Sequence, residues 1–220
     1  MSVARMVLLI IFGSLSVLNL VAVGLKLRKV QYFSTPLRVP CLAVFYILGS
    51  TGANWLVVTA LALAFIGDII WFLQKKEAFM MLMSGAYLLC FVLYAIALVQ
   101  PVSLLRGVPA WHYLAALVYI GYFVLIYSML KSSLGEMKGP MTVYFAVVMV
   151  MGFAALTRLW WYQGLAFWFP FAGSLAFIAS ETVHGFHLFK HRGETKHGEL
   201  FGDLFYISGQ LLLVLGFTMA

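Results

Sequence analysis

Two carboxylic residues, Asp68 and Glu181, lie within apolar stretches of this chain and could carry out chemistry there. Asp68 follows the run LALAFIG, and Glu181 follows AGSLAFIAS, with no Lys or Arg of the same stretch at the same depth. An ionisable side chain within a lipid bilayer costs free energy, so it usually has a function. In an apolar surrounding a carboxyl group favours its neutral form, and a protonated carboxyl can act as a general acid. We therefore expect a catalytic site around this pair.

The elements that position these residues follow from the composition. Of the 220 residues 64% are hydrophobic and 10% charged, and the mean hydropathy of +1.02 is typical of a helical membrane protein. We expect an all-α, polytopic membrane helix bundle that forms a single transmembrane domain over residues 1–220. The apolar runs predict eight transmembrane helices, near residues 6–25, 36–50, 54–73, 79–99, 110–130, 140–157, 164–189 and 202–219.

The second run is the weakest of the eight. Pro36 and Pro40 open it, and Gly49 and Gly52 close it. The stretch between them is shorter than the roughly 20 residues that a bilayer requires. We predict a short, tilted or kinked second span.

The basic residues predict the orientation in the membrane. Most of the 14 lie in the loops after the first, third, fifth and seventh spans: Lys26, Arg28, Lys29, Arg38, Lys75, Lys76, Lys131, Lys138, Lys190, Arg192 and Lys196. Arg5, Arg106 and Arg158 fall on the other face. The positive-inside rule then places both termini outside the cytoplasm. The net charge of +7 is explained by contact with anionic membrane lipids, without a nucleic-acid partner. Short loops suggest a bacterial inner membrane.

Several polar side chains are predicted at one depth of the bundle. At about 1.5 Å per residue, Asp68 lies about two turns, and Glu181 two to three turns, from the basic end of its helix. Similar levels are expected for Tyr87, Tyr94, Tyr144, Tyr206 and Gln210. These side chains could line a cavity in the cytoplasmic half, between the third, seventh and eighth helices. Tyr and Gln can also serve only as hydrogen-bonding contacts between membrane helices.

The order of these motifs resembles the YhhN-like lysoplasmalogenase family over nearly the whole chain. The matching segments are Thr35-Pro36-Leu37, Gly67-Asp68, Gly85-Ala86-Tyr87 with Tyr94, Gly139-Pro140 with Tyr144, Ser180-Glu181, and Tyr206 with Gln210. The resemblance implies an integral membrane hydrolase that cleaves the vinyl ether bond of lysoplasmalogens. The products would be a fatty aldehyde and a glycerophospho-ethanolamine or glycerophospho-choline.

The resemblance also implies roles for individual residues. Protonation of a vinyl ether carbon gives an oxocarbenium ion that water captures, so two carboxyl groups suffice, one protonated and one ionised. We expect Asp68 and Glu181 to be catalytic, without a metal or another cofactor. The expected residues of the lysophospholipid site are Tyr87, Tyr94, Tyr144, Ser180, His184, Tyr206 and Gln210, with Tyr206 and Gln210 orienting water or substrate.

Two positions depart from the family pattern. Where the family usually has Ser-Asp, this chain has Ser180-Glu181, and the longer side chain changes the reach of the carboxyl group. A histidine expected near Gly85-Ala86-Tyr87 is replaced by Phe91, so a proton transfer by that histidine is absent here.

Two other functions remain open from the residues. Glu181, His184, His187 and His191 share about one third of the circumference of a helix, and Glu-x-x-His is half of a motif that binds metals in helical bundles. These residues could belong to a metal-dependent membrane lipid enzyme, although the last two approach the basic membrane interface. The carboxyl groups could instead serve a non-catalytic lipid-binding or transport bundle. Aldehyde release distinguishes an enzyme from either of these.

Overall fold

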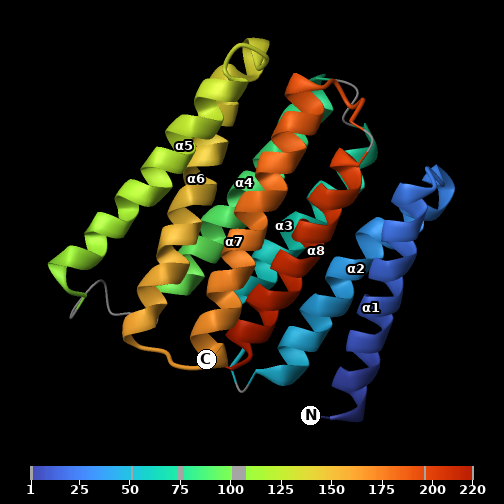
Figure 1. The fold of residues 1–220 in the computed structure, drawn as a ribbon. Coiled ribbons are helices and arrows are strands. Elements are labelled where there is room, and N and C mark those ends of the chain that lie inside the picture. The colour runs from blue at the N-terminus through green and yellow to red at the C-terminus, as the bar shows by residue number, and fades with distance from the viewer. Residues whose placement is uncertain (1, 51, 74–76, 101–107, 196, 220) are drawn as a thin grey trace. The chain divides into compact units, whose positions relative to one another are not determined.

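The computed structural model describes residues 2–50, 52–73, 77–100, 108–195 and 197–219, and every regular element in these ranges is a helix. The long helices are α1 (Val3–Gly24), α2 (Arg28–Gly49), α3 (Trp55–Ile70), α4 (Glu77–Val99), α5 (Ala116–Leu130), α6 (Lys138–Thr157), α7 (Leu165–Gly185) and α8 (Gly198–Phe217). Short helical turns extend several of them, so that the described residues contain eight apolar segments of 19 to 26 residues. Each is long enough to cross a bilayer. The predicted all-α membrane fold is confirmed (Figure 1).

The chain divides into two compact units, Met1–Leu93 and Tyr94–Ala220, and the division falls inside α4. Each unit is described below by itself. The single transmembrane domain over residues 1–220 stays a prediction.

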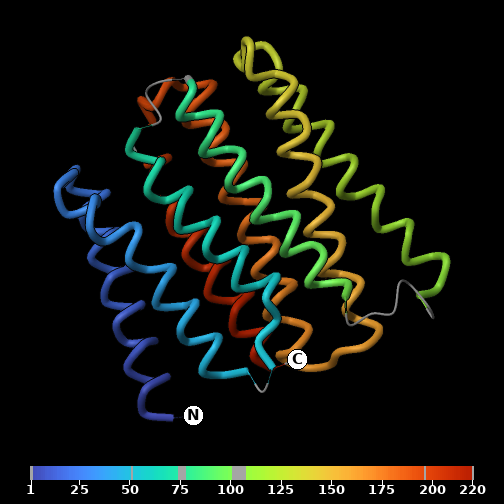
Figure 2. The backbone as a smooth tube through the Cα atoms, turned by 180° about the vertical axis from the view of Figure 1, so that it is seen from behind, coloured from blue at the N-terminus to red at the C-terminus, as the bar shows by residue number. Residues whose placement is uncertain are grey.

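In the first unit, α1 packs against α2, and α2 against α3 (Figure 2). The contact between α1 and α2 contains buried polar groups. Thr35 donates a hydrogen bond from Oγ1 to Oδ1 of Asn19 at 2.7 Å, and Gln31 donates from Nε2 to the Ala22 carbonyl at 3.1 Å. Such bonds hold membrane helices together, because no water competes for the polar groups.

The prediction that the second span is short is wrong. α2 has 22 residues from Arg28 to Gly49 and contains Pro36 and Pro40 in its interior rather than at its start. The prediction placed the start at Pro36 because proline is disfavoured inside a helix, but the polar residues before it, among them Gln31 and Ser34, already belong to α2. Those polar side chains are instead buried against α1, which compensates the cost of placing them there.

One of the basic residues used to predict the orientation, Arg38, does not lie in a loop. Arg38 lies inside α2 with 1% of its surface exposed, and its Nε donates to the Thr35 carbonyl at 3.1 Å. It is therefore a buried residue and not an interfacial cation. The predicted basic positions Lys75, Lys76, Arg106 and Lys196 lie outside the described residues.

In the second unit, α5, α6, α7 and α8 pack in chain order. α7 and α8 run side by side, connected by the turn after η6, the π-helical turn Phe186–Lys190 (Figure 1). Gly202, Gly209 and Gly216 recur every seven residues on α8 and face α7. At Gly173 of α7, a Cβ atom would lie 2.9 Å from the backbone nitrogen of Leu213. The glycines thus allow a close approach that fixes how the two helices face each other.

Arg158 lies in the second unit at the place where α4, α6 and α8 end. It follows the last residue of α6 and is completely buried. Its Nη1 donates to the carbonyl of Leu98, near the end of α4, at 3.4 Å. Its Cζ lies 4.0 Å from the ring centroid of Tyr162 and 5.6 Å from that of Phe217, the last residue of α8. Helix C-termini and aromatic faces both attract a cation. Arg158 was expected in a loop, and it is instead a packed part of the unit.

Candidate functional site

Asp68 is buried in α3 and is held by a tyrosine of the same unit. The hydroxyl of Tyr87 donates to Oδ1 of Asp68 at 2.7 Å, and Asp68 has 1% of its surface exposed. Gly67 makes this contact possible, because a Cβ atom there would lie 2.7 Å from the Tyr87 ring. The Gly-Asp pair and the tyrosine of the fourth helix, predicted separately, therefore form one structural group.

Glu181 has the same kind of partner in the second unit. The hydroxyl of Tyr144 in α6 donates to Oε2 of Glu181 in α7 at 2.7 Å. The Glu181 side chain is only partly buried, and its Oε1 has no hydrogen-bond donor among the residues that the structure describes. One carboxyl oxygen is thus held in place while the other is available for a proton transfer.

Tyr94, Gln210 and Tyr206 form a chain of hydrogen bonds. Tyr94 donates from its hydroxyl to Oε1 of Gln210 at 2.8 Å, and Nε2 of Gln210 donates to the hydroxyl of Tyr206 at 3.3 Å. All three side chains are buried, and the Tyr206 ring packs against Phe177 of α7. The chain fixes the orientation of the Tyr206 hydroxyl, which could position a water molecule or a polar substrate atom.

Ser180 and His184 lie where α7 approaches α8. The buried Ser180 hydroxyl donates to the carbonyl of Gly202 at 2.9 Å. The His184 ring lies over the same glycine, since a Cβ atom at Gly202 would fall within 3.0 Å of three ring atoms. One turn further, His187 is buried, and its Nδ1 is hydrogen-bonded to Oγ1 of Thr195. His187 was expected near the interface, and this bond explains its burial.

Asp203 is a residue that the sequence reasoning missed. It lies on α8 next to Gly202 and interacts electrostatically with His184. A signal was present, because Asp203, Tyr206 and Gln210 have the spacing i, i+3, i+7 and so share one face of a helix. Asp203 therefore adds a second carboxyl group, after Glu181, to the polar side chains described in the second unit.

The predicted histidine face does not gather around one point. Within the described ranges, no three His, Cys, Asp or Glu side chains are arranged to hold a metal ion. His187 is bonded to Thr195, whereas His191 is exposed. The two histidines nearest the end of that face thus have different surroundings.

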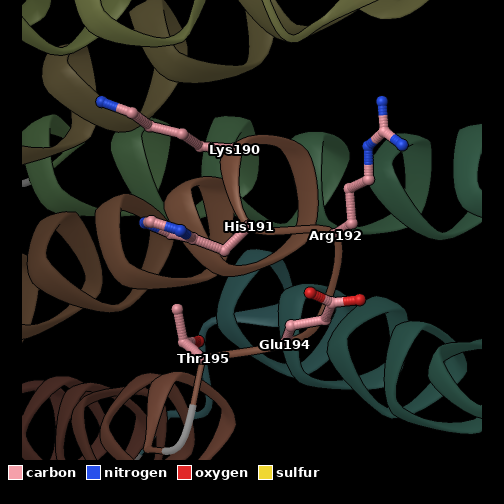
Figure 3. Close-up of a pocket in the computed structure, with 5 residues that line it drawn as sticks. All are labelled: Lys190, His191, Arg192, Glu194 and Thr195. Carbon is pink, nitrogen blue, oxygen red and sulfur yellow. The ribbon is translucent and has the colours of Figure 1, made fainter.

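A polar cavity of about 380 Å³ lies at the turn between α7 and α8. Its lining residues are Lys190, His191, Arg192, Glu194 and Thr195. In Figure 3 the side chains of Lys190 and Arg192 extend in different directions, so they do not converge on one ligand atom. This exposed basic turn fits a membrane surface better than an enclosed site.

The described part of the chain has the fold of an integral membrane protein, with eight apolar helices and with carboxyl groups that tyrosines hold inside the apolar segments. The chain belongs to the YhhN family, whose model matches residues 30–217. The predicted family is confirmed. No curated protein and no solved structure shows a significant match to the chain.

Proposed function

We propose that this protein is a lysoplasmalogenase of the membrane, which hydrolyses the vinyl ether bond of lysoplasmalogens. Two observations carry the proposal: Tyr87 holds Asp68 in the first unit, and Tyr144 holds Glu181 in the second, each with a hydrogen bond of 2.7 Å. Membership in the YhhN family is consistent with this activity.

The reaction needs an acid and an anion, and it needs no Ser or Cys nucleophile. A protonated carboxyl group transfers its proton to the β-carbon of the vinyl ether, and an oxocarbenium ion forms. A second carboxyl group, ionised, stabilises that cation, as in glycosidases. Water adds to give a hemiacetal, which breaks down to a fatty aldehyde and the glycerophospho alcohol.

We assign the two carboxyl roles to Asp68 and Glu181. Glu181 suits proton transfer because its Oε2 is fixed by Tyr144 and its Oε1 has no donor among the described residues. The hydrogen bonds of Gln210 with Tyr94 and Tyr206 support a role in orienting water or substrate. Ser180, through its bond to the Gly202 carbonyl, positions the start of α8.

The substrate in this proposal is a single-chain phospholipid that reaches the site from the bilayer. The eight apolar helices support a membrane location. We further propose a bacterial inner membrane, because the loops are short. We propose that both termini lie outside the cytoplasm, because most basic residues, among them the exposed Lys190 and Arg192, follow the first, third, fifth and seventh spans.

The test is aldehyde release from a lysoplasmalogen by the detergent-purified protein. We expect release by the wild type, in the presence or absence of a chelator, and a loss of about 10²- to 10⁴-fold in Asp68→Asn and in Glu181→Gln. A folded wild type that releases no aldehyde would refute the proposal. Activity that disappears with the chelator would favour a metal-dependent enzyme.

A further inference from the structure

We propose that His184 is the base that takes a proton from the attacking water, and that Gly202 and Asp203 of α8 are its positioning residues. The inference rests on the proposed vinyl ether hydrolysis. It names the residue that removes the water proton, a step that the assignment of the two carboxyl groups as acid and stabilising anion leaves open.

The first support is the position of His184 relative to Glu181. The two residues are three apart on α7, which places them about 60° apart around the helix axis and about 4.5 Å apart along it. Glu181 is bonded to Tyr144 of α6, while the His184 ring lies over Gly202 of α8. The two side chains contact different helices, so the imidazole would act on a substrate held at Glu181 through one water molecule.

The second support is the glycine under the His184 ring. A Cβ atom at position 202 would lie within 3.0 Å of Cε1, Nε2 and Nδ1 of His184, so any side chain there would move the ring. Ser180 fixes the same glycine through its carbonyl at 2.9 Å. The imidazole is therefore confined to the space between α7 and α8, as a positioned catalytic group must be.

The third support is electrostatic. Asp203 and His187 both interact electrostatically with His184. A carboxylate stabilises the imidazolium that forms when a histidine accepts a proton, which is the role of the third group in hydrolase triads. The Nδ1 atom of His187 is already bonded to Thr195, so His187 is the less suitable base of the two.

The proton balance of the reaction closes with this assignment. The carboxylic acid gives its proton to the β-carbon. Water then forms its bond to the cationic carbon while His184 takes the water proton, and a neutral hemiacetal results. In the second half, the imidazolium returns its proton to the oxygen of the departing glycerol, and the carboxylate takes the proton of the hemiacetal hydroxyl. The C–O bond breaks, and both groups recover their starting protonation states.

The experiment measures kcat and KM for aldehyde release by purified full-length variants. We expect His184→Gln to lower kcat by about 10²-fold or more, with KM nearly unchanged. Asp203→Asn should lower kcat about tenfold, since it removes only the charge beside the imidazole. Added imidazole should restore part of the activity of His184→Ala and should not restore activity to Glu181→Gln. A merely structural role of His184 would not produce this rescue.

His197→Gln is the matched control, because His197 is an exposed histidine before α8 whose side chain makes no capping hydrogen bond. Its kinetics should equal those of the wild type. Gly202→Ala tests whether the position of the His184 ring matters, without removing a functional group. It should lower kcat as His184→Gln does. If His184→Gln keeps the wild-type kcat, the inference is wrong while the proposed function stands. A wild type without aldehyde release overturns both.

Discussion

Two charged residues of the second unit, Arg158 and Glu181, lie in apolar helices and are accommodated in different ways. Arg158 is completely enclosed by the Leu98 carbonyl and by the rings of Tyr162 and Phe217. Glu181 is partly exposed and uses one carboxyl oxygen for Tyr144. The Arg158 guanidinium is bonded to a backbone carbonyl and packed between rings, so we expect it to serve the fold, whereas one carboxyl oxygen of Glu181 has no donor among the described residues and can take part in a reaction.

The surroundings of the two charges follow from where they lie on their helices. Arg158 comes directly after α6, near the last turns of α4 and α8, and the carbonyl groups at these helix ends carry partial negative charge. Glu181 lies inside α7, where the backbone carbonyls are already bonded within the helix, so only side chains can compensate its charge. Tyr144 supplies one such partner. We therefore expect changes at Glu181 to affect activity and changes at Arg158 to affect stability.

The largest effect is expected from Glu181→Gln. The change removes the acid or the anion while it keeps the size of the side chain, so kcat should fall by about 10²- to 10⁴-fold. The thermal midpoint in detergent should stay within about 2 °C of the wild type, because a surrounding apolar segment accepts an amide more readily than a charge. A variant that unfolds at a much lower temperature would show that Glu181 is structural.

Arg158→Ala should have the next largest effect, and it should act on stability. The substitution leaves a cavity among Leu98, Tyr162 and Phe217, so we expect a loss of about 2–5 kcal/mol in the free energy of unfolding. Activity per folded molecule should remain. Unfolding by denaturant in detergent measures the first quantity, and kcat measures the second.

Arg158→Met separates charge from packing in the same place. It fills most of the volume, so its loss of stability should be smaller than that of Arg158→Ala. If Arg158→Ala instead keeps full stability and loses kcat, Arg158 belongs to a functional site and the comparison with Glu181 fails.

Tyr144→Phe tests how much the hydrogen bond to Glu181 contributes to catalysis. It removes one hydrogen bond of 2.7 Å to Glu181 and keeps the ring. A hydrogen bond to a charged group contributes about 1.5–3 kcal/mol, so kcat should fall by about tenfold to a hundredfold. Tyr119→Phe is the control, since its hydroxyl donates to the Gly152 carbonyl at 3.2 Å and has no carboxyl partner in the described part of the chain. Equal kinetics of the two variants would contradict the role of Tyr144.

The smallest effect is expected from Tyr122→Phe. The hydroxyls of Tyr122 and Thr182 are 3.0 Å apart and connect α5 to α7, and Thr182 directly follows Glu181 in the chain. The loss should be about 0.5–1.5 kcal/mol in stability, with kcat unchanged. A large fall in kcat would show that the contact of α5 with α7 also positions Glu181.

The sequence predicted the helices better than it predicted their polar contacts. Mean hydropathy identifies the membrane-spanning segments because the insertion of a segment into lipid depends mainly on the composition of that segment. The prolines Pro36 and Pro40 placed the start of the second span too late, because the polar residues before them, Gln31 and Thr35, find their partners only on α1. A window along one segment cannot detect a partner on another.

The candidate site was likewise predictable in part. Asp68 and Glu181 stand out in the sequence because ionisable residues are rare in apolar segments. Their bonds to Tyr87 and Tyr144 join residues 19 and 37 positions apart, and only the packing of the helices reveals them. Asp203 was missed because it lies close to the start of α8, where an acidic residue attracts little attention.

The sequence by itself determined that this chain is an all-α membrane protein of the YhhN family with two carboxyl groups in its apolar segments. These properties depend on residue type and local order, which the chain carries before it folds. The tertiary structure decided that Arg158 is enclosed, that Tyr144 holds Glu181, and that His184 lies over Gly202. Each of these depends on which helix faces meet, and that is set by close packing between segments distant in the sequence.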